Sequence, residues 1–437
     1  MRLRDLLTRR PKVYPNVMDL DGVTQLEELV RAEVARRLHG TVPPMGVTEV
    51  RPLVAAVLAE VGDANNVPSP EDRELLLDHV CEMVVDFGPL HELVADPEVT
   101  TVVANGHDNI FYEKGGKRHV FDWTWPDEQH MRHTIERLLQ RNPGKRLDDA
   151  SPIVDLTLGD GGRLTIVIPP ASADGPVLTL RKYLDRYRTL TAFEEAGSLS
   201  LAMSAFLIAA VKARLSVLIS GASGSGKTTL MEAMAQHFAP SERIITIEDT
   251  LEMHLEQPDV VRLLTRGTNI EGAGAITTPE LFRATLRMRA DRILLGEIRG
   301  GEALDFLQAC TSGHLGSLAV LHASSGHEAL VRLQQMVQYN EVSLPLQVLR
   351  EQIADGLDLV VQIDKHVDGV RRVVEILEIR GVDEEGQIVT APVFKWVPTG
   401  TEEGRIVGGY EAQGVPQCLQ KLELAGVGLP EAFFDQA

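Results

Sequence analysis

The sequence is poor in cysteine, has no excess of basic residues and holds no uninterrupted apolar run long enough to span a membrane. Its three cysteines, Cys81, Cys310 and Cys418, are odd in number and far apart. We therefore expect neither a disulfide framework nor a cysteine metal site, as suits a reducing cytosol. The formal net charge of -20 argues against broad binding to nucleic acid or to an anionic membrane. An acidic protein of this kind binds phosphates only through a local site.

Segments that would direct the chain to a membrane are also missing. The N-terminus "MRLRDLLTRRPKVYP" is basic but lacks the apolar run and small-residue cleavage site of a secretory signal. The most apolar stretch, "LSLAMSAFLIAAVKARLSVLIS", is interrupted by Lys212 and Arg214, which excludes a membrane span. We expect a cytoplasmic protein that reaches the inner membrane only through partner proteins.

The periodicity of apolar residues changes along the chain and predicts several domains. Helical spacing over 22–60 and 70–86 gives way to alternating strand patterns with turns at Asn105-Gly106 and Gly115-Gly116. From residue 201 onward strands and helices alternate, which indicates a largely parallel sheet covered by helices. The expected divisions are a helical N-terminal module (1–86), an α+β domain (91–184), a linker (185–200), an α/β domain (201–397) and a C-terminal tail (398–437).

The segment "SVLISGASGSGKTTLMEAMAQHF" has the pattern of a P-loop between a strand and a helix. Glycines let such a loop curl so that its backbone N–H groups point at phosphate oxygens, and the helix N-terminus adds a favourable dipole. Lys227 would contact the β and γ phosphates, and the Thr228 hydroxyl would ligate Mg²⁺. The predicted nucleotide-binding residues are Gly221, Ala222, Ser223, Gly224, Ser225, Gly226, Lys227, Thr228 and Thr229.

Acidic residues stand at the ends of two later strands. "RIITIEDTLEMHL" ends a strand at Glu248 and Asp249, and "RILLGEIRGGEALDF" ends one with Glu297 and Arg299. The carboxyl ends of parallel strands line the crevice where ligands bind. A carboxylate there orients the attacking water or holds Mg²⁺ through its waters. Glu248 and Glu297 are both candidates for the catalytic acid, with Glu297 also a candidate metal ligand.

Taken together, the ordered motifs resemble the type II/type IV secretion ATPase superfamily. The P-loop, "ITIEDTLE", "LRMRADRILLGEIRGGEA" and "TSGHLGSLAVLHA" correspond to its Walker A, Asp box, Walker B and His box. Upstream, "GPLHELVADPEVTTVVANGHDNIFYEKGGK" and "GPVLTLRKY" resemble its Tad/Cpa-type pilus-assembly branch. The resemblance implies a RecA-like core, ATP with Mg²⁺, and a ring, expected to be a hexamer. It further implies action on an inner-membrane platform protein of a pilus or secretion machine.

The resemblance also assigns roles to histidines and arginines. His314 and His322 in the His box are expected to sense the γ-phosphate, with a purely structural role more plausible for His322 than for His314. A zinc site between them is the alternative, although no companion ligands accompany the eight-residue spacing. Arg163 and Arg181 match family arginines that reach the phosphates.

Two positions depart from the family pattern, and two other functions stay open. Thr250 stands where proline is usual and Val320 where threonine is usual, which puts the rate and the local strand geometry in question. The other functions are the ATPase of conjugative type IV secretion and a nucleotide-dependent scaffold with little turnover.

Overall fold

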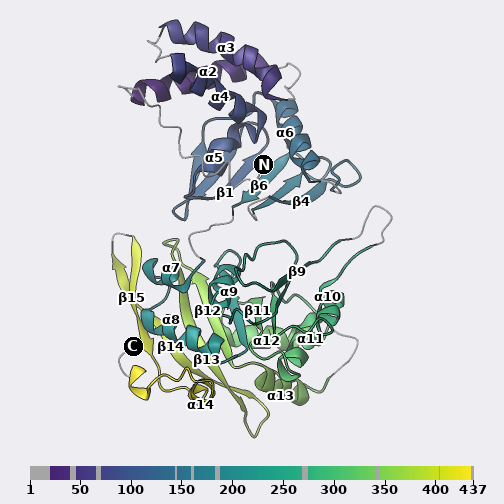
Figure 1. Cartoon of the computed structure of the whole chain (residues 1–437), viewed down its shortest axis with the longest axis vertical. Coiled ribbons are helices and arrows are strands. Elements are labelled where there is room, and N and C mark those ends of the chain that lie inside the picture. The colour runs from purple at the N-terminus through teal and green to yellow at the C-terminus, as the bar shows by residue number, and fades with distance from the viewer. Residues whose placement is uncertain are drawn as a thin grey trace. The chain divides into compact units, whose positions relative to one another are not determined.

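The computed structural model describes residues 20–39, 46–64, 70–142, 145–158, 162–182, 188–267, 274–339, 344–402 and 404–434. The chain divides into two compact units, Met1–Leu184 and Asp185–Ala437, whose elements are labelled in Figure 1. Residues 1–19 of the expected N-terminal module, 183–184 at the end of the expected α+β domain and 185–187 at the start of the expected linker lie outside the described residues.

Three helices come first among the described residues of the first unit, and the helical spacing over 22–60 is shared between two of them. Their apolar faces pack together around Val30, Val54 and Val80, which are fully buried. Such mutual burial is what stabilises amphipathic helices of this length. The helices are α2 (Leu20–Leu38), α3 (Val47–Ala64) and α4 (Pro70–Val85).

An antiparallel sheet completes the first unit, in the order β3-β2-β1-β6-β5-β4. The turns predicted at Gly106 and at Gly115-Gly116 are confirmed, and all three glycines have positive φ. Asp127 is the N-cap of helix α6 (Glu128–Gln140), and its side chain accepts a hydrogen bond from the His130 N–H. The other elements are η1 (Gly88–Leu90), α5 (His91–Ala95), β1 (Val99–Asn105), β2 (Ile110–Lys114), β3 (Lys117–Phe121), β4 (Ile153–Thr157), β5 (Arg163–Val167) and β6 (Val177–Arg181).

The second unit is built on a nine-stranded sheet in the order β15-β14-β13-β12-β7-β11-β10-β8-β9. From β12 to β9 every neighbouring pair is parallel, while β13, β14 and β15 extend the sheet with antiparallel strands. The expected mixed α/β fold class is confirmed. The strands are β7 (Val217–Gly221), β8 (Ile244–Glu248), β9 (Val260–Leu264), β10 (Arg292–Leu295), β11 (Leu318–His322), β12 (Leu359–Lys365), β13 (Arg371–Val382), β14 (Ile388–Glu402) and β15 (Arg405–Ala412).

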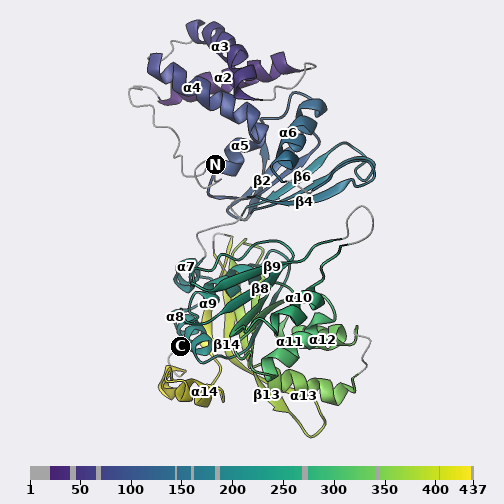
Figure 2. The same ribbon diagram turned by 45° about the vertical axis from the view of Figure 1, so that its right-hand side comes forward.

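Helices cover both faces of this sheet, because alternate strand residues point to opposite faces. Val217 and Ile219 of β7 pack with α7, α8, α9 and α14, whereas Leu218 packs with α10, α11, α12 and α13, as Figures 1 and 2 show. The helices are α7 (Leu190–Glu195), α8 (Leu201–Lys212), α9 (Lys227–Ala235), α10 (Thr278–Thr285), α11 (Glu302–Thr311), α12 (Gly326–Val337), α13 (Leu346–Gly356), α14 (Leu419–Leu424) and the 3-10 turn η3 (Glu431–Phe433).

Two of the expected domain boundaries differ from the structure. The expected linker 185–200 contains α7, whose Leu190 and Phe193 are buried in the core of the second unit. The expected boundary between 397 and 398 falls inside β14, which pairs with β15 across it. Both segments carry apolar residues that the sheet buries, so neither is separate from the second unit.

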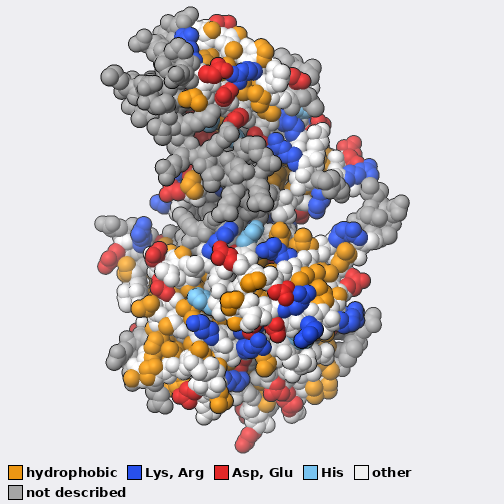
Figure 3. Space-filling view, in the orientation of Figure 1, with side chains coloured by type: hydrophobic (Ala, Val, Ile, Leu, Met, Phe, Trp, Pro, Cys, Tyr) orange, Lys and Arg blue, Asp and Glu red, His pale blue; other side chains and the backbone are white. Residues whose placement is uncertain are grey.

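The exposed surface mixes charges of both signs. On the face of the second unit drawn in Figure 3, acidic and basic side chains alternate with apolar ones. None of the helices within the described ranges is both long and apolar enough to cross a bilayer.

Candidate nucleotide-binding site

The predicted P-loop connects the end of β7 to the start of α9. A side chain at Gly221 would bring its Cβ to 2.1 Å from the Ile363 carbonyl oxygen of β12, so only glycine fits there. Gly226 has a φ of +99° as the N-cap of α9, a conformation that glycine adopts without strain. Ser225 is fully buried, and its Oγ has no hydrogen-bond partner among the described residues. The loop therefore presents backbone and an unused hydroxyl at the N-terminus of a helix.

Lys227 is the first residue of α9 and is buried. Its Nζ donates to the Ala222 carbonyl at 2.7 Å and to His322 Nδ1 at 3.2 Å. Burial lowers the pKa of Lys227 to about 8, while Glu297 and more distant acids act in the opposite direction. An incoming phosphate would offer this ammonium group a stronger acceptor than the loop carbonyl.

His322 joins the P-loop to Glu297. Its Nε2 lies 3.2 Å from Glu297 Oε1, so with Nδ1 accepting from Lys227 the neutral ring donates to Glu297 through Nε2. Burial, followed by the nearby Lys227 charge, lowers the pKa of His322. The register explains the placement, because His322 at the end of β11 stands opposite Gly221 at the end of β7.

The series of contacts between charged side chains continues beyond Glu297. Arg299 donates to Glu297 Oε2 at 2.8 Å and contacts Asp249 Oδ2 at 2.9 Å. The hydrogen bond to Glu297 raises the pKa of Arg299. A cavity of about 420 Å³ adjoins this side of Glu297, lined by Asp249, Arg299 and residues 265–267 and 277–279 among others. Glu297 thus contacts Lys227 through His322 on one side and faces open space on the other.

Glu248, the other candidate acid, is in a different environment. It is 4% exposed, and burial raises its pKa to about 7. Its Oε1 accepts from the N–H groups of Glu252 and Met253 at 2.9 Å, and its Oε2 accepts from Thr246 Oγ1 at 3.1 Å. Both oxygens hold the turn that follows β8, and Glu248 lies beside Gly296, next to Glu297.

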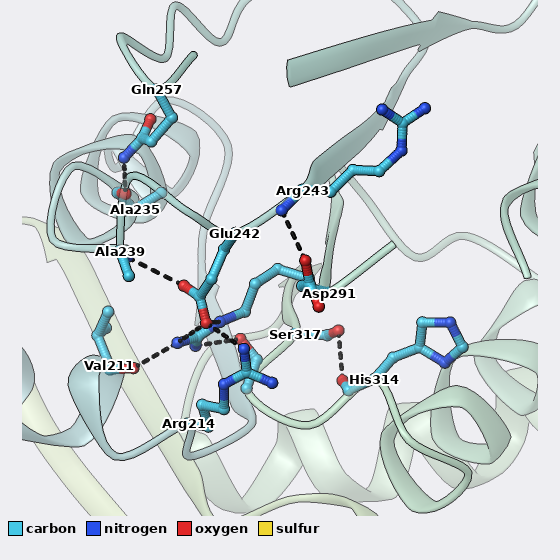
Figure 4. Close-up of polar contacts among 12 residues, drawn as sticks. Val211, Arg214, Ala235, Ala239, Glu242, Arg243, Gln257, Asp291, His314 and Ser317 are labelled. Atoms are coloured by element: carbon cyan, nitrogen blue, oxygen red, sulfur yellow. Dashed lines mark hydrogen bonds and ion pairs between the residues drawn. The ribbon is translucent and has the colours of Figure 1, made fainter. Parts of the chain in front are cut away.

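The structure does not bring His314 to the P-loop of its own chain. His314 precedes β11, and the two ends of this five-residue strand are about 13 Å apart. Its carbonyl accepts from Ser317 Oγ at 2.7 Å, and its N–H donates to Ala309. Figure 4 shows its ring pointing away from the Arg214–Glu242 group nearby. The preference for His314 over His322 is therefore reversed.

The zinc alternative fails for the same reason, since the two histidines lie at opposite ends of β11. Within the described ranges there is no group of three or more histidine, cysteine or acidic residues that could hold a metal ion.

The predicted arginines of the first unit lie next to each other. Arg163 on β5 stands directly opposite Arg181 on β6. Arg163 NH2 is 3.3 Å from Asp155, and its Nε is buried without a hydrogen-bond partner. Like charges directly opposite on neighbouring strands are destabilising, so this pair is suited to contact an anion.

The two departures from the family pattern leave the local structure intact. Val320 is buried, keeps its parallel pairing with Ile219, and accepts a backbone hydrogen bond from Ile298. Thr250 lies in the bend after β8.

Arg371 contacts the P-loop, and the sequence did not reveal this contact. From the start of β13, its Nε donates to the Gly224 carbonyl of the P-loop at 3.0 Å. The position after a polar turn in "KHVDGVRRVVEI" carries no signal of this contact. Only the pairing of β12 with β7 brings the β12–β13 turn beside the loop.

Comparison with known proteins identifies the chain's family. A family model described as "Type II/IV secretion system protein" matches residues 84–419. The chain belongs to this family. The expected resemblance to secretion ATPases is thereby confirmed, and with it the assignment of an ATPase.

Relatives in this family come from several bacteria. A putative conjugal transfer protein of Mycobacterium tuberculosis is 35% identical over 309 residues, covering 69% of this chain and 87% of the relative. The type IV secretion system protein PtlH of Bordetella pertussis is 35% identical over 323 residues, covering 67% and 94%. The VirB11 ATPase of the Brucella suis type IV secretion system, solved with sulphate, is 31% identical over 66% of this chain and 91% of that chain, with a TM-score of 0.36.

Proposed function

We propose that the chain is a Mg²⁺-dependent ATPase with a RecA-like core that works as a ring, as a hexamer, to power assembly of a Tad/type IV-like pilus or a related secretion system. The contact of Lys227 and Glu297 with the same histidine, His322, carries the proposal. It brings the phosphate-binding lysine and a water-accessible carboxylate to one place.

Glu297 is the residue we assign to orienting the attacking water. Its two oxygens accept hydrogen bonds from His322 and Arg299, and the adjoining cavity admits water. Glu248 is less suited, because it is 4% exposed, its oxygens hold the turn after β8 and burial favours its protonated form. Its role in this proposal is to position the turn after β8.

Mg²⁺ fits the donors that the site offers. Thr228 contributes a hydroxyl at the start of α9 and Glu297 a carboxylate, and Mg²⁺ prefers such oxygens, with few protein ligands beside substrate phosphates. When bound, the ion neutralises charge on the phosphates.

Arg163 and Arg181 are assigned to the transferring phosphate. A guanidinium group suits the charge that develops on a phosphoryl group in flight. In this proposal the ring works at the cytoplasmic side of the inner membrane on a platform protein, without nucleic acid.

A conjugative or effector-secreting type IV system is the second candidate. It is favoured by the 35% identity to a putative conjugal transfer protein and to PtlH. Deleting the gene and scoring surface pili, conjugal transfer and protein secretion in the same strain separates the candidates.

The enzymatic proposal is tested by phosphate release together with particle mass. The parent should release phosphate from MgATP and form a ring in the presence of a non-hydrolysable ATP analogue. Lys227→Ala should release none and bind ATP weakly. Parental turnover in Lys227→Ala would show that this loop is not the active site, and a parent without turnover would favour the scaffold reading.

A further inference from the structure

A second cavity lies in the first unit, apart from every residue assigned above. It measures about 30 Å³, is partly open, and is lined by α2, the end of α4, residues 88–89, residues 123–126 and α6; the three helices are labelled in Figure 2. A water needs about 10–15 Å³ of such volume, so the cavity has room for two or three waters or for one four-oxygen ion.

Two buried nitrogens line this cavity without a hydrogen-bond partner among the described residues. His130 is 6% exposed, and its Nε2 is unpaired. Arg31 Nε is likewise buried and unpaired, although its NH1 contacts Glu92 at 2.8 Å. Buried polar groups of this kind nearly always have a partner, so two of them on one cavity indicate that something polar occupies it.

The charges around the cavity select the sign of that occupant. Arg31, His130 and Arg137 line it, and no aspartate or glutamate is among its described lining residues. Asp127 Oδ1 lies 2.8 Å from His130 Nδ1, so the proton of the ring is held on Nδ1 and Nε2 is the ring nitrogen left for a ligand. This nitrogen donates to an anion as imidazolium, or accepts from a protonated oxygen of that anion.

The walls of the cavity are firmly held, which favours a built site over a loose gap. The Trp125 ring donates through Nε1 to Thr134 Oγ1 at 3.1 Å, and any side chain at Gly88 would clash with that ring. The Arg31 guanidinium stacks on Trp123 at 4.7 Å. The arginine is therefore oriented before any ligand arrives, which lowers the entropy lost on binding.

We propose that this cavity binds a compact oxyanion of the phosphate class, held by Arg31 of α2 and by His130 and Arg137 of α6. Guanidinium groups match the oxygens of such ions in pairs. The bound ion would join α2 to α6 and so stabilise the packing of the N-terminal helices on the sheet domain.

Tryptophan fluorescence tests the site directly, because two of the three tryptophans line it. The full-length protein should carry Lys227→Ala, to remove phosphate binding at the P-loop, and Trp396→Phe, to leave only Trp123 and Trp125 as reporters. Titration with potassium phosphate should give a saturable change that potassium chloride at equal ionic strength does not give. Glycerol 3-phosphate should bind more weakly, because the volume of the cavity has no room for its glycerol group.

Three further variants keep the result interpretable. Arg31→Gln should weaken phosphate binding at least tenfold. Ala35→Leu, which fills the cavity without removing a charge, should abolish binding while the fold is retained. Arg132→Gln, on the exposed side of α6 where Arg132 pairs with Glu128, should change nothing. The absence of saturation in the background protein, undiminished binding in Ala35→Leu, or tighter binding of glycerol 3-phosphate would each overturn the proposal.

Discussion

Burial determines how the polar side chains around the P-loop behave. Lys227, His322 and Glu248 all have pKa values shifted towards the neutral form by loss of solvent. Glu297 has another kind of surroundings, because its two oxygens contact His322 and Arg299 and it borders a cavity. The sequence offered two acids and two histidines with equal chemistry, and only their surroundings distinguish them.

The two histidines should separate cleanly by mutation. His322→Ala should lose preference for ATP over ADP, because His322 contacts the lysine that the third phosphate would reach. A hydrogen bond to a charged group is worth about 1.5–3 kcal/mol, so the loss should be roughly 10- to 150-fold. His314→Ala should leave the ratio of ATP to ADP affinity unchanged. Titration of both nucleotides on each variant checks this. A loss of ATP affinity without a loss of ADP affinity in His314→Ala would support His314 as the γ-phosphate sensor instead.

Glu248 should make stability depend on pH. Its pKa is raised in the folded state from 4.5 to about 7, so its contribution is fully present below about pH 4.5 and is lost as pH rises through 7. The shift corresponds to about 3 kcal/mol. Glu248→Gln keeps one oxygen that can accept from the Glu252 and Met253 N–H groups and carries no charge, so it should lose this part of the pH dependence. Urea unfolding of parent and variant at pH 5 and pH 8 measures it, and identical pH dependence in both would exclude the effect.

At the level of elements, a buried ionic cluster joins the end of α8 to the starts of β8, β10 and β11, at the ends of these strands opposite the P-loop. Arg292, 1% exposed at the start of β10, donates to Glu242 and to the carbonyls of Val211 and Gly316. Its guanidinium also stacks on Phe238 at 4.4 Å. Figure 4 shows Glu242 at the centre of this cluster, with Arg214 as its second partner.

Removing the central carboxylate should therefore be costly. Glu242→Ala leaves the buried Arg292 uncompensated, and the expected loss is about 3–5 kcal/mol of unfolding free energy. Asp259→Ala is the matched control, since its pair with Arg243 is partly exposed and should contribute no more than about 1 kcal/mol. Urea denaturation of the two variants compares them directly. Equal losses would mean that burial of the cluster does not matter.

The sequence predicted the elements that carry long apolar runs and missed those that depend on tertiary pairing. The runs that become β7, β8, β10 and β11 were expected, because central parallel strands are buried on both faces. Strands β9 and β15 lie at the sheet edges, where half-exposed sequences such as "VVRLL" resemble loops. The exposed end of β14 resembles a loop in the same way, so the predicted boundary between 397 and 398 falls inside that strand.

At the scale of the whole molecule, the sequence defined the composition of the site but not its geometry. The P-loop residues could be predicted because a strand, glycines and a helix follow one another locally. Which end of β11 lies beside the P-loop, and which acid borders a cavity, depend on register between distant segments. Arg371 was invisible for that reason, since 147 residues separate it from Gly224.

Substitution of Arg163 and Arg181 tests whether the first unit takes part in ATP hydrolysis. Arg163→Gln and Arg181→Gln should each lower turnover, by about 10³-fold if they act on the transferring phosphate, while ATP still binds. Arg118→Gln, an exposed arginine on β3 of the same sheet, is the control and should keep the parental rate. Phosphate release measured beside nucleotide affinity checks all three. Unchanged turnover in both Arg163→Gln and Arg181→Gln would confine catalysis to the second unit.

In the proposed mechanism Glu297, which His322 joins to Lys227, orients the water that attacks ATP. Single-turnover phosphate release by Glu297→Gln, with ATP affinity measured on the same preparation, tests it most directly. Glu297→Gln should bind ATP within a few-fold of the parent and release phosphate more slowly by about two orders of magnitude or more. Release at the parental rate by Glu297→Gln, together with loss of release in Glu248→Gln, would contradict it and assign the reaction to Glu248.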